Sequence, residues 1–407
     1  MGLSGVKAIL ASMGNPHKGL KIIHVSGTNG KGSTCSFLQH ILIAAGFKVG
    51  TFTSPHLKQY NERISINGIP ISDANFARLM TQVSQISKDA QLSFFEILTC
   101  MAYLFFAQQK VDVAIIETGI GGRLDATNVI DEALLSVITA PGYDHQEILG
   151  ETLAEIALED AGIIKNNCPV AVYPTPVICD IQKIALAKNA PLYYTGEDVE
   201  IKNISFSLNN TTFCVRTAYF YYQSLSIQLL GKHQVKNAVH ALLCVEALRK
   251  NHKLAINEDA VRNGLANCKW QARFEIVSHN PYIVIDGAHN VDGARIFNEA
   301  LKLYFSHKKI VLVVGISNNK DYKSILQNMM ADTNGIIDTV ICTCTSFRSI
   351  PAQILADCVK KDIMEVDTGK VIVEEDCRLA VKRAIKVAKT DGVTAVAGSL
   401  YLVGECL

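Results

Sequence analysis

A glycine-rich segment near the amino terminus has the residue types that phosphate chemistry requires. The apolar run Ile22–Val25 leads into residues 26–34, Ser-Gly-Thr-Asn-Gly-Lys-Gly-Ser-Thr, and the helix-like segment Cys35–Ala45 follows. Glycines let backbone N–H groups close around phosphate oxygens, a lysine adds positive charge, and a hydroxyl at a helix start can bind Mg²⁺. We therefore expect a phosphate-binding loop, although its spacing, G-x-x-G-K-G-[ST], is shorter than the common Walker pattern. The alternative is a glycine turn that merely joins strand to helix.

Three further polar residues follow strand-like segments in the first half of the chain. They are Ser54, Glu117 and His145. Hydroxyl and carboxylate oxygens suit Mg²⁺, and α/β proteins place their ligands at the carboxyl ends of parallel strands. A histidine there can bind a metal or act as a general base. Taken singly, each also fits a plainer role: a turn serine, a strand-end glutamate in a solvated loop, or a surface histidine.

Four residues farther along the chain are candidates for nucleotide contacts. Asn237 lies near the start of a predicted helix, where it could face a base or sugar or belong to an ordinary helix cap. Arg273 precedes a predicted linker, and Asp286 and His289 follow it. An arginine at a domain hinge can reach a phosphate when domains close. The residues alone fit surface positions equally well.

Composition excludes several classes of protein. At 407 residues the chain is long enough for two domains, and its 49% apolar content can build buried cores. A net charge of +1 argues against a basic nucleic-acid-binding surface. No apolar run approaches the roughly 18–20 residues of a membrane span, and the amino terminus lacks a signal peptide. The twelve cysteines form no C-x-x-C pair, so we expect reduced thiols, no zinc site and a cytoplasmic location.

Strand-like and helix-like segments alternate in the first part of the chain, which predicts parallel α/β architecture. The predicted strands are Ile22–Val25, Val49–Phe52, Val113–Ile116, Leu135–Thr139 and Val170–Tyr173. The predicted helices, besides the one after the glycine-rich loop, are Asp73–Ser87, Phe95–Gln108 and Thr152–Ile164.

Residues 200–230 differ, because β-branched and aromatic residues predominate there, and they predict a β-rich insertion. Its predicted strands are Ile201–Leu208, Thr211–Thr217 and Tyr219–Leu229, and a helix at Val235–Lys250 follows. A second α/β pattern has predicted strands at Tyr282–Ile285, Ile310–Val314, Thr339–Cys342 and Thr394–Ala397. The polar segment Ser278–Pro281 precedes it. We place the linker there, which predicts domains at 1–277 and 282–407.

The ordered motifs together resemble the folylpolyglutamate synthase and dihydrofolate synthase family, a branch of the Mur ligases. The resemblance covers nearly the whole chain, and its motifs lie at residues 24–34, 53–57, 61–64, 94–96, 121–128, 144–145, 162–165, 233–234, 273–275, 286–290 and 398–401. It implies an α/β fold with a P-loop Mur-ligase-type central domain that carries the β-rich insertion. A smaller Rossmann-like carboxyl-terminal domain would close over the nucleotide.

The resemblance also implies the reaction. The family consists of ATP-dependent carboxylate–amine ligases that use Mg²⁺. A folate or dihydropteroate carboxylate takes the γ-phosphate of ATP to form an acyl phosphate, and the amino group of L-glutamate displaces phosphate to leave an amide, ADP and phosphate. A monovalent cation requirement and a monomeric state are further expectations from the family.

The family pattern carries roles onto residues of this chain. Those implied to act in catalysis are Lys31, Glu117, His145, Asp160 and Arg273. The implied ATP contacts are Thr28, Asn29, Gly30, Lys31, Gly32, Ser33, Asn237, Arg273 and Asp286. The implied metal ligands are Ser54, Glu117 and His145, and the implied pterin contacts are Phe94, Phe95, Leu124, Asp125 and Ala126. Two phenylalanine rings and one carboxylate suit a flat heteroaromatic ring.

Three departures from the family pattern open alternatives. Asp160 stands where the family has a lysine that is carbamylated near the metals, so a folate-binding homologue without catalysis is one alternative. The chain begins late relative to relatives that use dihydropteroate, which favours folate elongation. Ala140-Pro141 and Gln271-Ala272 replace Asn-Ile and Pro-Gly beside the expected nucleotide site. A simple ATPase or phosphotransferase is a third function class, and it would turn over nucleotide without glutamate.

Overall fold

The computed structural model describes residues 2–88, 90–194, 196, 199–218, 221–333, 335–363 and 370–406. They form two compact units. Unit 1 comprises Met1–Ser205, Thr212–Gln228 and Val235–Lys269, and unit 2 comprises Phe206–Thr211, Leu229–Gln234 and Trp270–Leu407, apart from the residues outside this description. The chain therefore passes into unit 2 for the last time at Trp270, eight residues before the predicted linker begins.

The predicted linker at Ser278–Pro281 is wrong. Strand β12 (Glu275–His279) pairs antiparallel with β13 (Tyr282–Ile285), and His279 lies opposite Tyr282 in the register. Asn280 and Pro281 are therefore the turn of a hairpin inside unit 2. Polar turn residues look alike in a hairpin and in a linker, and the largely polar sequence of β12 did not indicate a strand.

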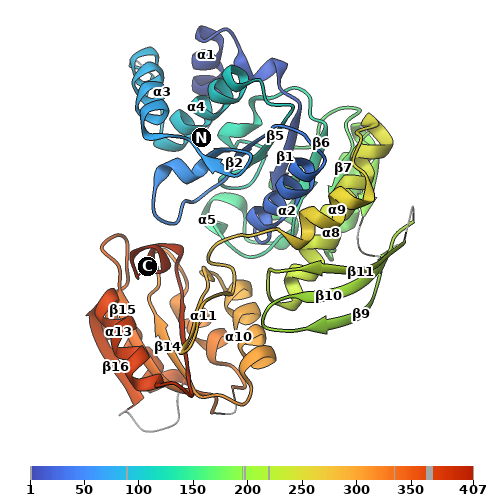
Figure 1. Ribbon diagram of the computed structural model, residues 1–407. Helices are drawn as coiled ribbons and strands as arrows, with labels where there is room; N and C mark the ends of the chain where they lie inside the picture. Colours follow the sequence, from blue (N-terminus) through green and yellow to red (C-terminus); the bar gives the residue numbers. More distant parts are fainter. Residues whose placement is uncertain are drawn as a thin grey trace. The chain divides into compact units, whose positions relative to one another are not determined.

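Unit 1 is built around an eight-stranded sheet with the order β4-β3-β2-β5-β1-β6-β7-β8 (Figure 1). Its strands are β1 (Ile22–Ser26), β2 (Val49–Phe52), β3 (Ile64–Ile66), β4 (Ile69–Pro70), β5 (Val113–Glu117), β6 (Leu135–Ile138), β7 (Val170–Val172) and β8 (Leu192–Tyr194). All pairings from β2 to β8 are parallel, and β3 and β4 add an antiparallel edge. Every residue of β1 and β5 is buried, as expected for central parallel strands.

Helices cover this sheet. They are α1 (Ser4–Ser12), α2 (Lys31–Ala44), α3 (Asp73–Ile86), α4 (Phe94–Gln109), α5 (Gln146–Leu149), α6 (Leu153–Ala161), α7 (Ile178–Ala187), α8 (Lys232–His252) and α9 (Glu258–Ala266), with short 3₁₀ turns η1 (Pro16–Gly19), η2 (Tyr60–Arg63) and η3 (Ala126–Val129). Helices α1, α3 and α4 share one apolar core with β1, β2 and β5. Helices α2 and α9 pack so closely that a Cβ at Gly264 would collide with Ile41. The predicted strands and helices of this region are confirmed, with ends shifted by a few residues.

The predicted β-rich insertion is present as a three-stranded sheet with the order β11-β10-β9. Its strands are β9 (Glu200–Phe206), β10 (Thr211–Arg216) and β11 (Tyr221–Ile227). The predicted start of the third strand at Tyr219 and Phe220 lies outside the described residues.

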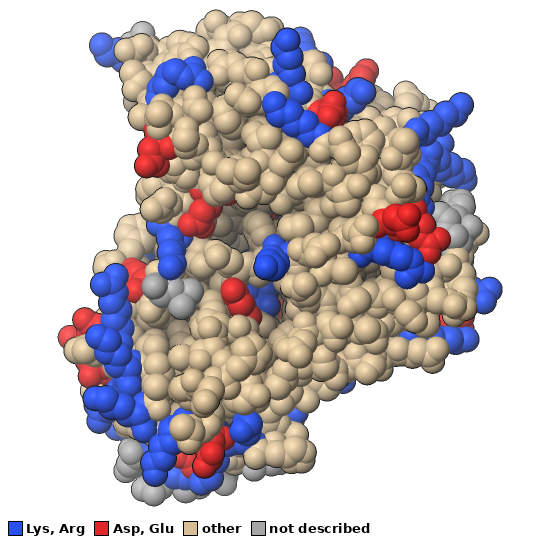
Figure 2. All heavy atoms as spheres, viewed as in Figure 1, with Lys and Arg blue, Asp and Glu red and all other residues tan. Residues whose placement is uncertain are grey.

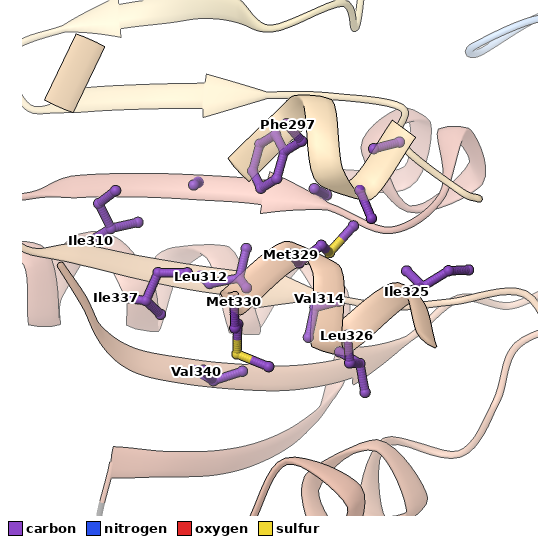
Figure 3. Close-up of a cluster of buried hydrophobic side chains, with 14 of the residues drawn as sticks. Phe297, Ile310, Leu312, Val314, Ile325, Leu326, Met329, Met330, Ile337 and Val340 are labelled. Atoms are coloured by element: carbon purple, nitrogen blue, oxygen red, sulfur yellow. The ribbon is translucent and has the colours of Figure 1, made fainter. Parts of the chain in front are cut away.

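Unit 2 contains a six-stranded sheet with the order β12-β13-β17-β14-β15-β16, parallel except for β12. Its remaining elements are β14 (Ile310–Val314), β15 (Ile337–Cys344), β16 (Val371–Asp376), β17 (Val393–Ala397), α10 (Val291–Phe305), α11 (Tyr322–Met330), α12 (Ala352–Cys358), the π-helical turn η4 (Val359–Ile363), α13 (Cys377–Ala388) and α14 (Leu400–Cys406). Figure 3 shows side chains of β14, such as Leu312, against Leu326 and Met330 of α11. This is the predicted Rossmann-like arrangement.

Charge and hydropathy give a simple picture of the surface. On the face drawn in Figure 2, basic and acidic side chains are scattered over a largely uncharged surface, apart from a run of lysine and arginine side chains down the lower left edge. Among the described residues, no helix has the length and apolar character that crossing a membrane requires.

One buried carboxylate lies where the β-rich insertion meets α8. Glu246 on α8 is 2% exposed, and its Oε1 accepts a hydrogen bond of 2.5 Å from the Thr217 hydroxyl. Its Oε2 has no hydrogen-bond partner among the described residues. Burial raises the pKa of Glu246 to about 7, against the opposing effects of Thr217 and Arg249. The folded state therefore keeps a proton that the unfolded chain releases at lower pH.

We expect Glu246→Gln to stabilise the protein at alkaline pH. A carboxylic acid whose pKa is raised in the folded state lowers the stability of the fold once the pH exceeds the ordinary pKa of that acid. The loss grows until the pH reaches the raised pKa of about 7, and it persists at higher pH. Glutamine cannot titrate, so its advantage over the native residue should grow to roughly 2–3 kcal/mol between about pH 5 and about pH 8. Urea unfolding across this range measures it, with the exposed Glu132→Gln as control. A difference independent of pH would contradict the assignment.

Candidate functional site

The glycine-rich loop joins β1 to α2, and the next strand holds its backbone. The N–H groups of Thr28 and Asn29 donate to the carbonyl of Ala140 at 3.2 and 3.0 Å, and the Thr28 hydroxyl pairs with both main-chain groups of Gly142. A Cβ at Gly27 would collide with Thr139. These contacts come from main-chain atoms at 140 and 142, which explains physically how Ala140-Pro141 can replace the family's usual residues there.

Lys31 and Asn237 lie at the same loop. Lys31 begins α2, and its Nζ lies 2.6 Å from the Gly27 carbonyl and 3.4 Å from that of Thr28. The predicted phosphate-binding lysine is thus folded over the loop that it would serve. Gly30 has φ +86°, and a Cβ there would lie 2.9 Å from Oδ1 of Asn237 on α8. The loop therefore approaches Asn237 as closely as a residue without a side chain permits.

The predicted metal ligands Ser54 and Glu117 are brought together. In the register of the sheet, Phe52 of β2 lies beside Ile116 of β5, so both chains leave the sheet at one edge. The Ser54 N–H donates to Glu117 Oε2 at 3.0 Å, and Glu117 is buried. On its other side Glu117 lies beside Val25 of β1. The phosphate loop, Ser54 and Glu117 thus follow the carboxyl ends of three adjacent parallel strands.

His145 is not shown to join that pair. It precedes α5 with φ 51°, and its ring nitrogens lie 3.9 and 3.8 Å from Asp144 and Glu147. In the part of the chain that the structure describes, no three His, Cys, Asp or Glu side chains are close enough to hold a metal ion. Mg²⁺ is commonly held by one or two carboxylates together with phosphate oxygens and water. Glu117 and Ser54 fit that kind of site.

Asp160 lies beneath the phosphate loop. It is 1% exposed on α6, and its Oδ1 is 2.8 Å from the hydroxyl of Ser26, the last residue of β1. Burial raises the pKa of Asp160 to about 6, although the Ser26 hydrogen bond and the Lys31 charge act against that rise. Ser26 was not selected from the sequence. The available signal was a hydroxyl at a strand end just before a glycine loop.

The predicted pterin contacts separate into two places. Phe95 lies 5.7 Å from Phe52 between ring centroids, and a Cβ at Gly119 would meet both Phe95 and Asp125. Phe94 is 44% exposed and packs instead against Tyr60, with ring centroids 4.9 Å apart. Consecutive helical residues point about 100° apart, so the two rings leave the start of α4 in different directions. Ala126 is buried next to Asp125, and Leu124 is exposed.

A buried network that the sequence did not reveal supports this second place. Asp125 accepts hydrogen bonds from the N–H groups of Gly119 and Ile120 and from both the N–H and the hydroxyl of Thr127. His24 Nε2 lies 2.8 Å from the Thr127 hydroxyl, and burial lowers the pKa of His24 to about 3, so its ring is neutral. The network ties the glycine-rich loop after β5 to the middle of β1.

Unit 2 brings Arg273 and Asp286 together. Asp286 is buried and accepts hydrogen bonds from the N–H groups of Phe274 and Ala288 at 2.7 and 2.6 Å. Burial raises its pKa to about 6, and the Arg273 charge opposes that rise. Ala272 and Phe274 have φ 55° and 44°, so the turn around Arg273 is strained on both sides. Ala272 adopts here the backbone that glycine adopts without strain, and glycine is the residue it replaces in the family. His289 Nδ1 lies 2.8 Å from the Gly287 carbonyl.

Comparison with protein families gives two matches. Residues 25–245 match the Mur ligase middle domain, and residues 272–400 match the Mur ligase, glutamate ligase domain. The first match alone spans more than half of the chain.

Individual relatives agree with the family models. The chain is 39% identical to the dihydrofolate synthase/folylpolyglutamate synthase of Bacillus subtilis over 337 residues, which cover 81% of this chain and 78% of the relative. It is similar to Mycobacterium tuberculosis folylpolyglutamate synthase complexed with ADP and AMPPCP, with a TM-score of 0.90, 29% identity, and coverage of 99% of this chain and 94% of the other. Escherichia coli FolC in complex with DHPP and ADP gives a TM-score of 0.88, 30% identity, and coverage of 99% and 92%.

Gly30→Ala should weaken nucleotide binding, whereas Gly46→Ala should not. Both glycines have a left-handed backbone, with φ +86° and +88°, so alanine costs each fold about 1 kcal/mol. Only at Gly30 does the new methyl group meet Asn237, because nothing lies within 4 Å of a Cβ at Gly46. We expect ADP affinity at least about tenfold lower in Gly30→Ala alone, measured by calorimetry. Equal ADP affinities in the two variants would show that the close approach of Gly30 to Asn237 does not matter for nucleotide binding.

Proposed function

The chain belongs to the folylpolyglutamate synthase and dihydrofolate synthase family of Mur ligases, and from this premise we propose how its residues carry out the family reaction. The protein is an ATP-dependent ligase. We propose that it joins L-glutamate to the carboxylate of a folate or dihydropteroate. The supporting observation is that the phosphate loop, Ser54 and Glu117 follow three adjacent parallel strands in unit 1.

The reaction needs a leaving group, because a carboxylate resists attack by an amine. In the proposed sequence the acceptor carboxylate oxygen bonds to the γ-phosphorus of ATP while the bond to ADP breaks. The glutamate amine then bonds to the acyl carbon, loses a proton, and phosphate leaves. Charge neutralisation and alignment supply most of the catalysis in such phosphoryl transfers. In our proposal Thr28, Asn29, Gly30, Lys31, Gly32 and Ser33 hold the phosphates.

The residues near Glu117 fit Mg²⁺. Glu117 offers a buried carboxylate and Ser54 a hydroxyl, and phosphate oxygens with water would complete the coordination. The ion would neutralise charge on the phosphates. Lys31 begins the adjacent helix and would move from the Gly27 carbonyl to the terminal phosphates when nucleotide binds. Some expectations stay predictions: the monovalent cation, the monomeric state, the cytoplasmic location, and the roles of His145, Asn237, Arg273 and Asp286.

The acceptor is proposed to bind beside Phe95, Asp125 and Ala126. A pterin can stack on the Phe95 ring next to the backbone of Gly119. The carboxylate oxygens of Asp125 already accept four hydrogen bonds, so in this proposal Asp125 chiefly shapes the loop. Phe94 and Leu124 are exposed and are weaker candidates. The relatives bear names of both acceptor classes, and the choice between them is left to experiment.

A mass-spectrometric product assay tests the function. The protein with MgATP and L-glutamate should add one glutamate to tetrahydrofolate, to dihydropteroate, or to both. ATP turnover without glutamate and without product would favour a simple ATPase instead. The comparisons do not support the non-catalytic alternative, and binding of both ligands without any product would be needed to revive it.

Glu117→Gln should abolish Mg²⁺-dependent ligation without unfolding the protein. The amide keeps the size of the side chain but removes the charge that the cation requires, so we expect kcat to fall at least about 100-fold. Glu246→Gln makes the same change at another buried glutamate and should leave ligation intact. Steady-state product formation at several Mg²⁺ concentrations measures both. Wild-type activity in Glu117→Gln would remove Glu117 from the metal site.

A further inference from the structure

Four groups meet at the hydroxyl of Ser26. They are Ser26 itself, Thr118, Gly121 and Asp160, and we call them the Ser26 cluster. Ser26 Oγ lies 2.8 Å from Asp160 Oδ1, 2.8 Å from the Gly121 carbonyl, and 3.2 Å from the Thr118 hydroxyl, which donates to it. Ser26, Thr118 and Asp160 are buried. Three segments far apart in the sequence are therefore joined through one side-chain oxygen.

The segments joined are those that would carry the two reacting partners. Ser26 immediately precedes the phosphate loop, and Gly121 lies in the glycine-rich loop whose other end is held by Asp125. Asp160 comes from α6, whose backbone also contacts the second loop, because Arg123 donates its N–H to the Glu159 carbonyl at 2.8 Å. Buried hydrogen bonds of this kind specify one arrangement, since each lost partner leaves a costly unpaired group.

Counting protons shows what Asp160 contributes. A serine hydroxyl has one hydrogen and two acceptor sites, so Ser26 cannot donate to Asp160 and Gly121 at once. If Asp160 carries a proton, it donates to Ser26, and Ser26 is free to donate to the Gly121 carbonyl. The three hydrogen bonds of the Ser26 hydroxyl are then satisfied, whereas Oδ2 of Asp160 has no hydrogen-bond partner among the described residues. Burial raises the pKa of Asp160 to about 6, which favours the protonated form relative to an ordinary aspartate.

We propose that Asp160 and Ser26 are positioning residues that hold the phosphate loop and the glycine-rich loop in register, so that the acceptor carboxylate meets the γ-phosphate. Asp160 acts through Ser26 and touches neither substrate nor metal. This inference rests on the proposed function, since it concerns alignment within the ligase reaction. It replaces the direct catalytic role that the sequence predicted for Asp160.

The key comparison is between Asp160→Asn and Asp160→Ala. An asparagine amide can donate to Ser26 as a protonated aspartate does, so the register should survive and kcat should stay within about threefold of wild type. Alanine at position 160 removes the donor to Ser26, and Ser26→Ala removes the acceptor of that bond together with the donor to the Gly121 carbonyl. A misalignment of about 1 Å can cost roughly 100-fold in rate, and water can then take the phosphoryl group that the acceptor misses. We expect Asp160→Ala and Ser26→Ala to lose at least about tenfold in kcat with KM for ATP little changed, and to release more ADP than amide product.

Thr152→Ala is the matched control for stability. Thr152 caps the same helix α6 from an exposed position, because its hydroxyl accepts the Glu155 N–H at 3.2 Å. Loss of this cap should lower the melting temperature without changing the ratio of ADP to amide product, since a smaller folded fraction lowers the amounts of ADP and of amide equally. If Asp160→Ala behaves like this control, the cluster is merely structural and the proposal is wrong. If Asp160→Asn is as inactive as Asp160→Ala, the proposal is also wrong, and Asp160 acts instead as a charged carboxylate in catalysis or metal binding.

A second measurement keeps this inference separate from the proposed function. If the wild-type chain makes no amide product, the proposed function fails, but the melting temperatures of Ser26→Ala, Asp160→Ala and the double variant still test the cluster. The double variant should be no less stable than the worse single variant, because each single change already breaks the same contact. Additive losses would mean that the two residues do not act together.

Discussion

The parallel pairing of β1 with β5, and of β5 with β2, is the constraint on which the candidate site depends. Parallel strands in register end at one edge, so three loops distant in sequence must start within a few ångströms of each other. The hydrogen bonds from Ser54 to Glu117 and from Thr118 to Ser26 form only because the strands bring these segments together. Because every residue of β1 and β5 is buried, a slip in register would disturb the packing on both faces of the sheet and misplace Glu117 at once.

Beneath that edge, hydrogen-bonded polar groups hold the loops. His24 is kept uncharged by burial, burial raises the pKa of Asp160 to about 6 and so favours its neutral form, and backbone groups of Ala140 and Gly142 fix the phosphate loop. Buried neutral groups can be satisfied by hydrogen bonds alone, whereas a buried charge needs a partner of opposite sign. The supports are therefore compatible with a site that must itself accept highly charged phosphates.

The sequence predicted the parts of this protein that depend on local pattern. Buried apolar runs marked the parallel strands, and glycine, lysine and hydroxyl residues marked the phosphate loop. The hairpin β12–β13 was not predicted because β12 is short, its residues do not alternate regularly between apolar and polar, and its turn looks like a linker. The divergence of Phe94 from Phe95 was accessible in principle from helix geometry. The contacts of Ser26, Thr127 and Asp160 were not, because long-range hydrogen bonds between single side chains leave no periodic signal.

Two departures from the family pattern, at Ala140-Pro141 and at Ala272, lie where the fold constrains the backbone more than the side chain. At Ala140-Pro141 the phosphate loop contacts main-chain atoms, so the side chains are free to change. Ala272 must adopt φ 55°, and the Asp286 carboxylate holds the turn by accepting the neighbouring Phe274 N–H. At position 160 the requirement is different, because a short buried side chain reaches Ser26 directly. The family's carbamylated lysine is several bonds longer and carries its anionic group farther from the helix, so it does not suit this short contact at a 1% exposed position. The aspartate and the closed Ser26 cluster therefore form a self-consistent pair.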